Sequence, residues 1–182
     1  MMNTSPAWLL VPAILAPAAV VSPAYAVQYL SADAAQKLLF PEATQFVSHL
    51  VRLDETQKRI VEQAAKVRMR YPEQPVWQVL ANGQPAGWFV LDEVYGKHEF
   101  ITYAVALDAS GAVRGIEILD YRETHGSQIT HAKWRAQFNG ARHGAALKLD
   151  EDIQNISGAT LSCKHISEGV RRVLALHAVA LK

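Results

Sequence analysis

The chain has one cysteine, little charge bias and no charged residue before Asp33. With Cys163 alone, it cannot form an intramolecular disulfide or a multi-cysteine zinc or iron–sulfur site. Its formal net charge of +1 excludes the basic excess that nucleic-acid binders use to neutralise phosphates, so we expect no nucleic-acid partner. Because 50% of the 182 residues are apolar and 19% are charged, the sequence is typical of a folded globular protein.

The sequence also lacks the spacing patterns of metal and catalytic sites. The 7 histidines do not form a ligand motif such as His-Glu-x-x-His, so we expect no metal site. No catalytic dyad is found. A thiol at a helix start has a lowered pKa, but without a second cysteine or a His/Asn partner we expect Cys163 to be a packing residue.

The uncharged start of the chain resembles an export signal. Residues 7–21 are apolar over about the length of a signal-peptide core, and Ala24-Tyr25-Ala26 has the small-x-small form of a cleavage site. Prolines within this stretch would interrupt a membrane-spanning helix. We therefore predict a signal peptide over residues 1–26, cleavage after Ala26 and a periplasmic location. An uncleaved N-terminal anchor is the alternative, although no Lys or Arg precedes the apolar core in either case.

Two helices are predicted in an N-terminal helical segment, residues 27–75. The first covers residues 29–40, with Ser31 as a possible N-cap. The second covers about 54–70 and places Ile60, Ala64 and Val67 on its buried side.

We expect residues 76–182 to form one compact unit with residues 27–75. Segments rich in β-branched and aromatic residues, separated by turn signals, predict strands at 76–80, 87–95, 100–108 and 113–121. Strand 100–108 carries Ile101, Tyr103, Val105 and Leu107 on its larger apolar face, which predicts one covered side. Helices are predicted at 132–138 and 161–181. The expected fold class is α+β: an antiparallel sheet of hairpin-connected strands, with N-terminal helices and a C-terminal helix packed on it.

A run of small and hydroxyl-bearing residues precedes the C-terminal helix. It consists of Ser157, Gly158, Ala159, Thr160, Leu161 and Ser162. Unpaired N–H groups at a helix start bind anions, a glycine lets the backbone approach closely, and hydroxyls donate to phosphate oxygens. From the residues alone, a plain N-cap remains the alternative. Lys164 and His165 follow in the first turn, where each either contacts the phosphate or lies in solvent.

This hexapeptide resembles the flavinylation motif of the FMN-binding domain family. That family includes small periplasmic subunits of sodium-pumping NADH:quinone reductases and of related electron-transport complexes. The resemblance implies that FMN is the cofactor and that a flavin transferase joins its phosphate to Thr160 through a phosphoester. It extends upstream to a loop similar to the family's Glu-Thr-Pro-Gly loop, which here consists of Glu123, Thr124, His125 and Gly126.

Two positions depart from the family pattern. Gln154 stands where family members usually have an aspartate, with Asp152 two residues further upstream, and His125 replaces the proline of the upstream loop. A transferase that recognises the aspartate would be affected by the first departure. The motif therefore supports FMN binding more fully than it supports the covalent link.

The resemblance implies an exported flavoprotein that carries electrons rather than a self-contained enzyme. Its partners would be a membrane redox protein of the ferric-reductase or cytochrome type and the flavin transferase. Two alternatives remain: a non-redox binding or assembly module that uses the helix start for a phosphate or carboxylate, and a flavin-dependent reductase of a small substrate. Several aromatic side chains are available to contact the flavin ring: Tyr95, Tyr103, Tyr121, Trp134 and Phe138.

Overall fold

The computed structural model describes residues 27–181, so the predicted signal peptide lies outside the described residues. The strands are β1 (Val27–Gln28), β2 (Gln45–Val51), β3 (Gln74–Ala81), β4 (Gln84–Tyr95), β5 (Phe100–Asp108) and β6 (Val113–Tyr121). The helices are α1 (Ala32–Leu39), α2 (Glu55–Ala65), α3 (Ala132–Arg135) and α4 (Thr160–Ala180), with short 3₁₀ turns at Ser127–Thr130 and Ala136–Phe138. Within residues 27–181, no helix combines the length and the apolar character needed to cross a membrane.

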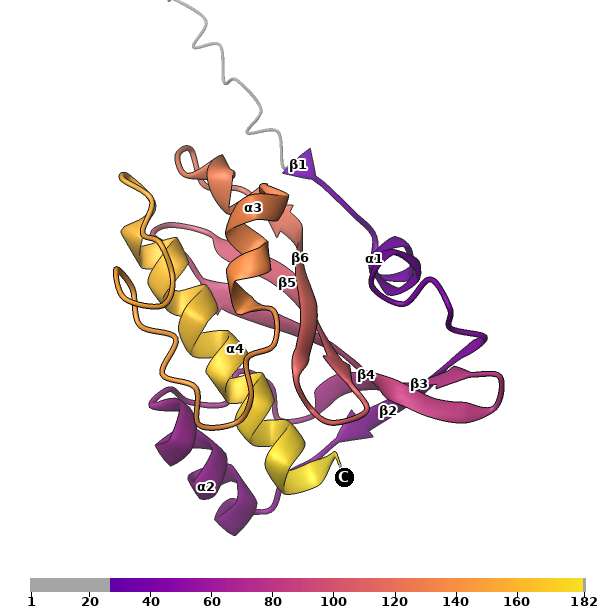
Figure 1. Ribbon diagram of the computed structural model, residues 1–182. Helices are drawn as coiled ribbons and strands as arrows, with labels where there is room; N and C mark the ends of the chain where they lie inside the picture. Colours follow the sequence, from indigo (N-terminus) through magenta and orange to yellow (C-terminus); the bar gives the residue numbers. More distant parts are fainter. Residues whose placement is uncertain (1–26, 182) are drawn as a thin grey trace, which may run out of the picture.

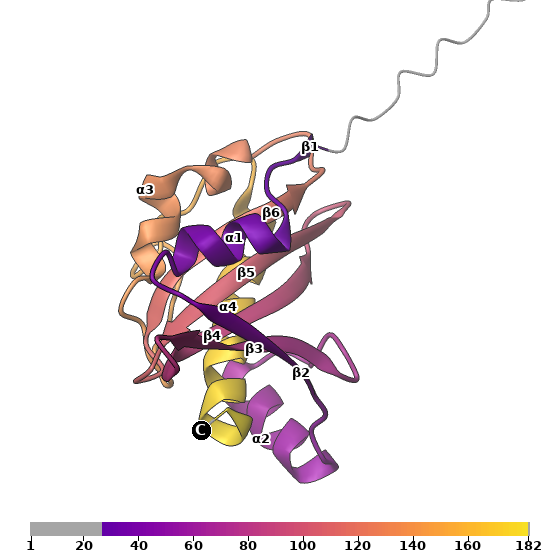
Figure 2. The same ribbon diagram turned by 90° about the vertical axis from the view of Figure 1, so that its right-hand side faces the viewer.

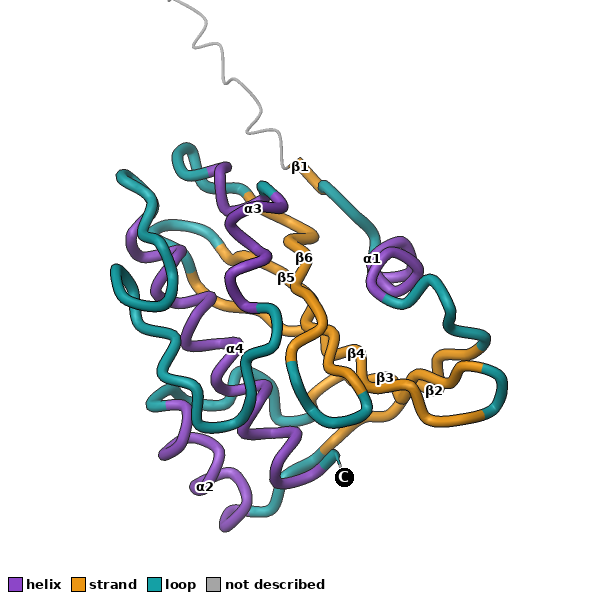
Figure 3. Tube along the Cα trace, in the orientation of Figure 1, coloured by secondary structure: helices purple, strands orange, loops and turns teal. Residues whose placement is uncertain are grey.

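The strands form one antiparallel sheet in the order β1-β6-β5-β4-β3-β2 (Figures 1 and 3). Strands β2 to β6 follow one another along the chain, and tight turns join β3 to β4, β4 to β5 and β5 to β6. Asn82 and Gly83 adopt positive φ values of 51° and 78°, which suit a tight hairpin turn. The predicted α+β class and the hairpin order are confirmed.

Helices cover both faces of the sheet. Figure 2 shows α1 crossing one face, while α4 runs along the other. The predicted apolar face of β5 packs in the same core cluster as residues of α4. Its opposite face is covered too, because Ala104 and Ala106 are buried in a second cluster that contains residues of α1. The expectation of a single covered side is therefore wrong. The short side chains of Ala104 and Ala106 leave room for α1 to pack on this second face.

Two strands and one helix face differ from the sequence-based expectation. The sequence does not predict β1 or β2; β2 is an edge strand with mostly exposed side chains and no clear apolar alternation. Helix α2 buries Val61 and Ala65, whereas Ile60 is 48% exposed, so the predicted face is shifted by one position. The helix also ends early, because Lys66 adopts a left-handed conformation that closes it.

A buried ion pair joins α4 to the sheet. The Arg172 guanidinium lies 2.7 Å from the Asp92 carboxylate and also donates to the Arg68 carbonyl. The Tyr103 hydroxyl donates to the same Asp92 oxygen at 2.6 Å, and burial raises the pKa of Tyr103 well above its ordinary value, so it remains a donor. Since Asp92 is 0% and Arg172 6% exposed, the charges compensate each other away from solvent.

We predict that Asp92→Ala lowers the free energy of unfolding by about 3–5 kcal/mol, because it leaves the Arg172 charge buried and unpaired. Urea unfolding followed by circular dichroism measures this change. The matched control is Glu73→Ala, which breaks an ion pair whose arginine side chain, Arg52, is 76% exposed. That loss should not exceed about 1 kcal/mol. Equal losses in the two variants would contradict the anchoring role.

Candidate functional site

The start of α4 presents backbone donors that no side chain satisfies. Ala159 occupies the N-cap position and makes no side-chain cap hydrogen bond, and the first turn contains no acidic residue. Gly158 precedes it with a φ of +81°, a left-handed conformation that glycine adopts without strain. Free N–H groups and the positive end of the helix dipole therefore face outward at Thr160.

A pocket of about 450 Å³ opens in front of this helix start. Three segments far apart in the sequence line it: the β4–β5 turn, the loop after β6 and the first turn of α4. Its lining residues are Lys97, His98, Glu123, Thr124, His125, Gly158, Ala159, Thr160, Leu161 and Ser162. The two motifs singled out in the sequence therefore meet at one pocket.

The loop after β6 fits closely against the motif. Gly126 has a φ of +88°, and a Cβ at this position would collide with the Ala159 Cβ. The Tyr121 hydroxyl donates a hydrogen bond to the His125 carbonyl and so holds the loop in place. Only glycine at position 126 permits this approach.

Glu123 organises the opposite wall. One of its carboxylate oxygens accepts hydrogen bonds from the backbone N–H groups of Lys97, His98 and Glu99, the last two at 2.7 and 3.1 Å. Partial burial raises the pKa of Glu123, but these hydrogen bonds outweigh it, and the net pKa lies below the ordinary value of 4.5. Glu123 lines the pocket, and its carboxylate holds the β4–β5 turn in place.

The turn supplies two site residues that the sequence alone does not identify. Lys97 and His98 are exposed and line the same pocket as the helix start. The sequence marks this stretch as a turn, but only the pairing of β4 with β5 and the Glu123 hydrogen bonds bring it to the motif. Lys97 adds a cation that is suited to a phosphate.

The other predicted residues take different positions around the pocket. Thr160 is exposed within it, whereas Ser157 is exposed next to it and does not line it. Ser162 is buried, and its side chain hydrogen-bonds with that of Tyr121. Cys163 is fully buried, and burial raises the pKa of its thiol, in keeping with a packing residue.

Neither Gln154 nor Asp152 lines the pocket at Thr160. The Gln154 backbone N–H donates to the Gln137 side chain, and its carbonyl accepts from the Trp134 indole at 2.8 Å. The Asp152 carboxylate accepts from the Lys148 backbone N–H. These contacts hold both residues in the loop before the motif.

Of the aromatic side chains considered for the flavin ring, four belong to the core. Tyr103, Tyr121, Trp134 and Phe138 are each at most 5% exposed. Tyr95 is 49% exposed and forms an edge-to-face pair with Phe100, which is itself 40% exposed. This pair borders the β4–β5 turn and is available to a ligand.

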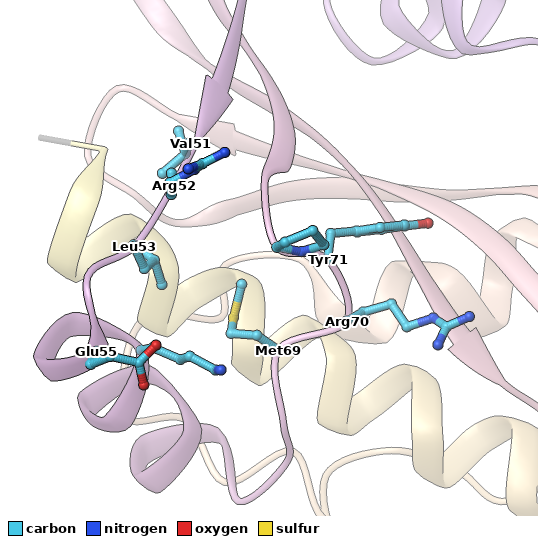
Figure 4. A pocket seen from close by; sticks show the side chains of 9 residues that line it. Val51, Arg52, Leu53, Glu55, Met69, Arg70 and Tyr71 are labelled. Atoms are coloured by element: carbon cyan, nitrogen blue, oxygen red, sulfur yellow. The ribbon is translucent and has the colours of Figure 1, made fainter.

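Another pocket, of about 470 Å³, lies between the end of β2, the start of α2 and residues 69–72 (Figure 4). Its arginines are already paired, Arg52 with Glu73 and Arg70 with Glu93. Burial, together with the nearby carboxylates, raises the pKa of Tyr71 to about 12. None of the predicted site residues lines this pocket. Among the described residues, no group of three or more His, Cys, Asp and Glu side chains is placed to hold a metal ion.

The chain is thus an antiparallel-sheet domain with a pocket at an uncapped helix start that is suited to an anion. Residues 96–175 match the model of the FMN-binding domain family. The matched range begins at the β4–β5 turn and includes both motifs. FMN is therefore the cofactor of this domain, and the donors at the start of α4, together with Lys97, fit its phosphate.

Other comparisons are more remote. No curated protein sequence matches the chain. The fold is similar to that of one component of the Na⁺-translocating NADH-quinone reductase from Parabacteroides distasonis, at 16% sequence identity and a TM-score of 0.45, over 79% of this chain and 84% of that chain. A likeness at this level carries no argument about function.

We predict that Glu123→Gln destabilises the protein at neutral pH, because a neutral amide accepts the three N–H groups less strongly than a carboxylate. A group with a lowered folded-state pKa contributes stability above its unfolded pKa and loses it as the pH falls through the folded value. The difference between wild type and variant should therefore shrink below pH 4.5. Thermal unfolding at several pH values measures it, and a constant difference would contradict this role.

Proposed function

We propose that this protein is an exported electron carrier whose FMN is linked through its phosphate to Thr160. The observation that carries the proposal is the exposed Thr160 hydroxyl at the uncapped start of α4, inside the matched FMN-binding segment. When bound, FMN supplies the redox chemistry, and the protein supplies binding and orientation.

The pocket supports each part of the attachment. Backbone N–H groups at Thr160 and the following residues stabilise phosphate charge, and Lys97 lines the same pocket. The Thr160 oxygen forms the new ester bond to phosphorus as it loses its proton, and a bond from phosphorus to a leaving group breaks. An activated flavin nucleotide must therefore be the donor, and a flavin transferase is the partner that brings it.

Residues 1–26 would direct export and be removed after Ala26, which leaves the carrier in the periplasm. Its electron partner would be a membrane redox protein of the ferric-reductase or cytochrome type. The exposed position of Thr160 and the 42% exposure of Leu161 beside it support a flavin accessible to such a partner.

We predict that protein exported by a host with the flavin transferase carries an FMN-sized added mass and stays fluorescent in a denaturing gel. Thr160→Ala should lose both signals, because alanine has no hydroxyl group that could form the ester. Intact mass spectrometry measures the attachment and locates the cleavage site in the same spectrum. The matched control is Thr56→Ala, an exposed threonine on α2, which should keep the flavin.

The possible outcomes separate the parts of the proposal. Covalent flavin that survives Thr160→Ala contradicts the acceptor assignment. Flavin that is lost on denaturation of the wild type contradicts the covalent link and leaves a reversible FMN carrier. A colourless protein that stays free of flavin with the transferase present contradicts the carrier function and favours a non-redox module.

A further inference from the structure

A smaller pocket lies next to the phosphate site along α4. It has a volume of about 290 Å³ and occupies the free edge of β4, where β3 pairs no further than Val90. We call it the edge pocket; α4, the end of the β4–β5 hairpin and residues 67–70 line it. The last segment is held there by hydrogen bonds from Arg172 to the Arg68 carbonyl and from Arg70 to Glu93.

The edge pocket faces the same side of α4 as the phosphate site. Leu161 lines the phosphate site, and His165 and Glu168 line the edge pocket, at the three- and four-residue spacing that places side chains on one helix face. His165 stands about 7.5 Å beyond Thr160 along the helix axis, at about 1.5 Å per residue. A ligand held by its phosphate at Thr160 can extend a ribityl chain along this face.

One wall of the edge pocket is aromatic and flanked by charge. Phe100 is partly exposed there, and the Arg70 guanidinium lies 4.3 Å from the centre of its ring. Arg70 is also paired with Glu93, which holds it in place. The Arg70 guanidinium, stacked on Phe100, therefore offers a flat aromatic ligand a fixed planar cation.

His165 has a fixed tautomer in this wall. Its Nδ1 hydrogen-bonds with the Tyr95 carbonyl, and because a carbonyl can only accept, the hydrogen must be on Nδ1. In the neutral ring, Nε2 is then an acceptor, and it has no hydrogen-bond partner among residues 27–181. The edge pocket therefore offers an acceptor to a ligand N–H.

We infer that the flavin ring of FMN anchored at Thr160 lies in the edge pocket, where Nε2 of His165 accepts a hydrogen bond from its N3–H group. This inference rests on the proposed function. Oxidised flavin has a single ring N–H, at N3, so the acceptor is matched to that edge of the ring. His165 is a binding residue in this arrangement, and the planar guanidinium of Arg70 contacts the ring face.

The test compares two probes on protein produced without the flavin transferase, so that binding is reversible. FMN and its N3-methyl derivative are titrated separately, and flavin fluorescence gives each Kd. We expect FMN to bind about five- to tenfold more tightly, because the methyl group removes the N–H and leaves Nε2 unpaired. His165→Leu should reduce this ratio to one, and His165→Gln, which keeps a donor and an acceptor, should retain much of it.

A purely structural role for His165 gives a different result. If it only ties α4 to β4, then His165→Leu weakens both flavins equally and the ratio is unchanged, which overturns the inference. His143→Leu, on an exposed loop, is the matched control and should leave both constants unchanged. Equal binding of both probes to the wild type contradicts this inference alone, whereas binding of neither contradicts the proposed FMN site as well.

Discussion

The ion pair between Asp92 and Arg172 fixes where α4 lies on the sheet, and the functional end of the molecule depends on that position. The pair is buried, and Tyr103 completes it, so α4 is held at one register along β4. With its middle fixed in this way, the helix presents its first turn beside the β4–β5 hairpin. The position of the phosphate site therefore depends on an ion pair that lies about three helical turns further along α4.

Around that helix start, each loop is held by an interaction of its own rather than by a ligand. The Glu123 carboxylate accepts hydrogen bonds from backbone N–H groups of the β4–β5 turn, and the Tyr121 hydroxyl holds the loop that leads to Gly126. The pocket is thus formed before any cofactor binds, which reduces the ordering cost of binding. Preorganisation also suits a carrier, because a rigid site changes little between the oxidised and reduced states of a flavin.

Much of this arrangement is predictable where local chemistry is strong. The limits of β5 and β6 follow from turn residues and β-branched runs, and the motif before α4 identifies the site by the donors that a helix start must leave free. Other features depend on partners distant in sequence. β2 is an edge strand with a weak pattern, and α2 turns its Val61 face inward because α4 lies there. Lys97 is brought to the site by the β4–β5 pairing and by the Glu123 hydrogen bonds. No local signal encodes those contacts.

The close fit of Gly126 against Ala159 has a consequence for how this protein can diverge. A side chain at position 126 would displace the Ala159 segment, so any substitution there disturbs the site even though Gly126 does not line the pocket. Lys97, Thr124 and His125 instead line the pocket from fixed loops and are exposed. Ligand preference and partner recognition can therefore evolve through side chains alone, on a frame that stays constant.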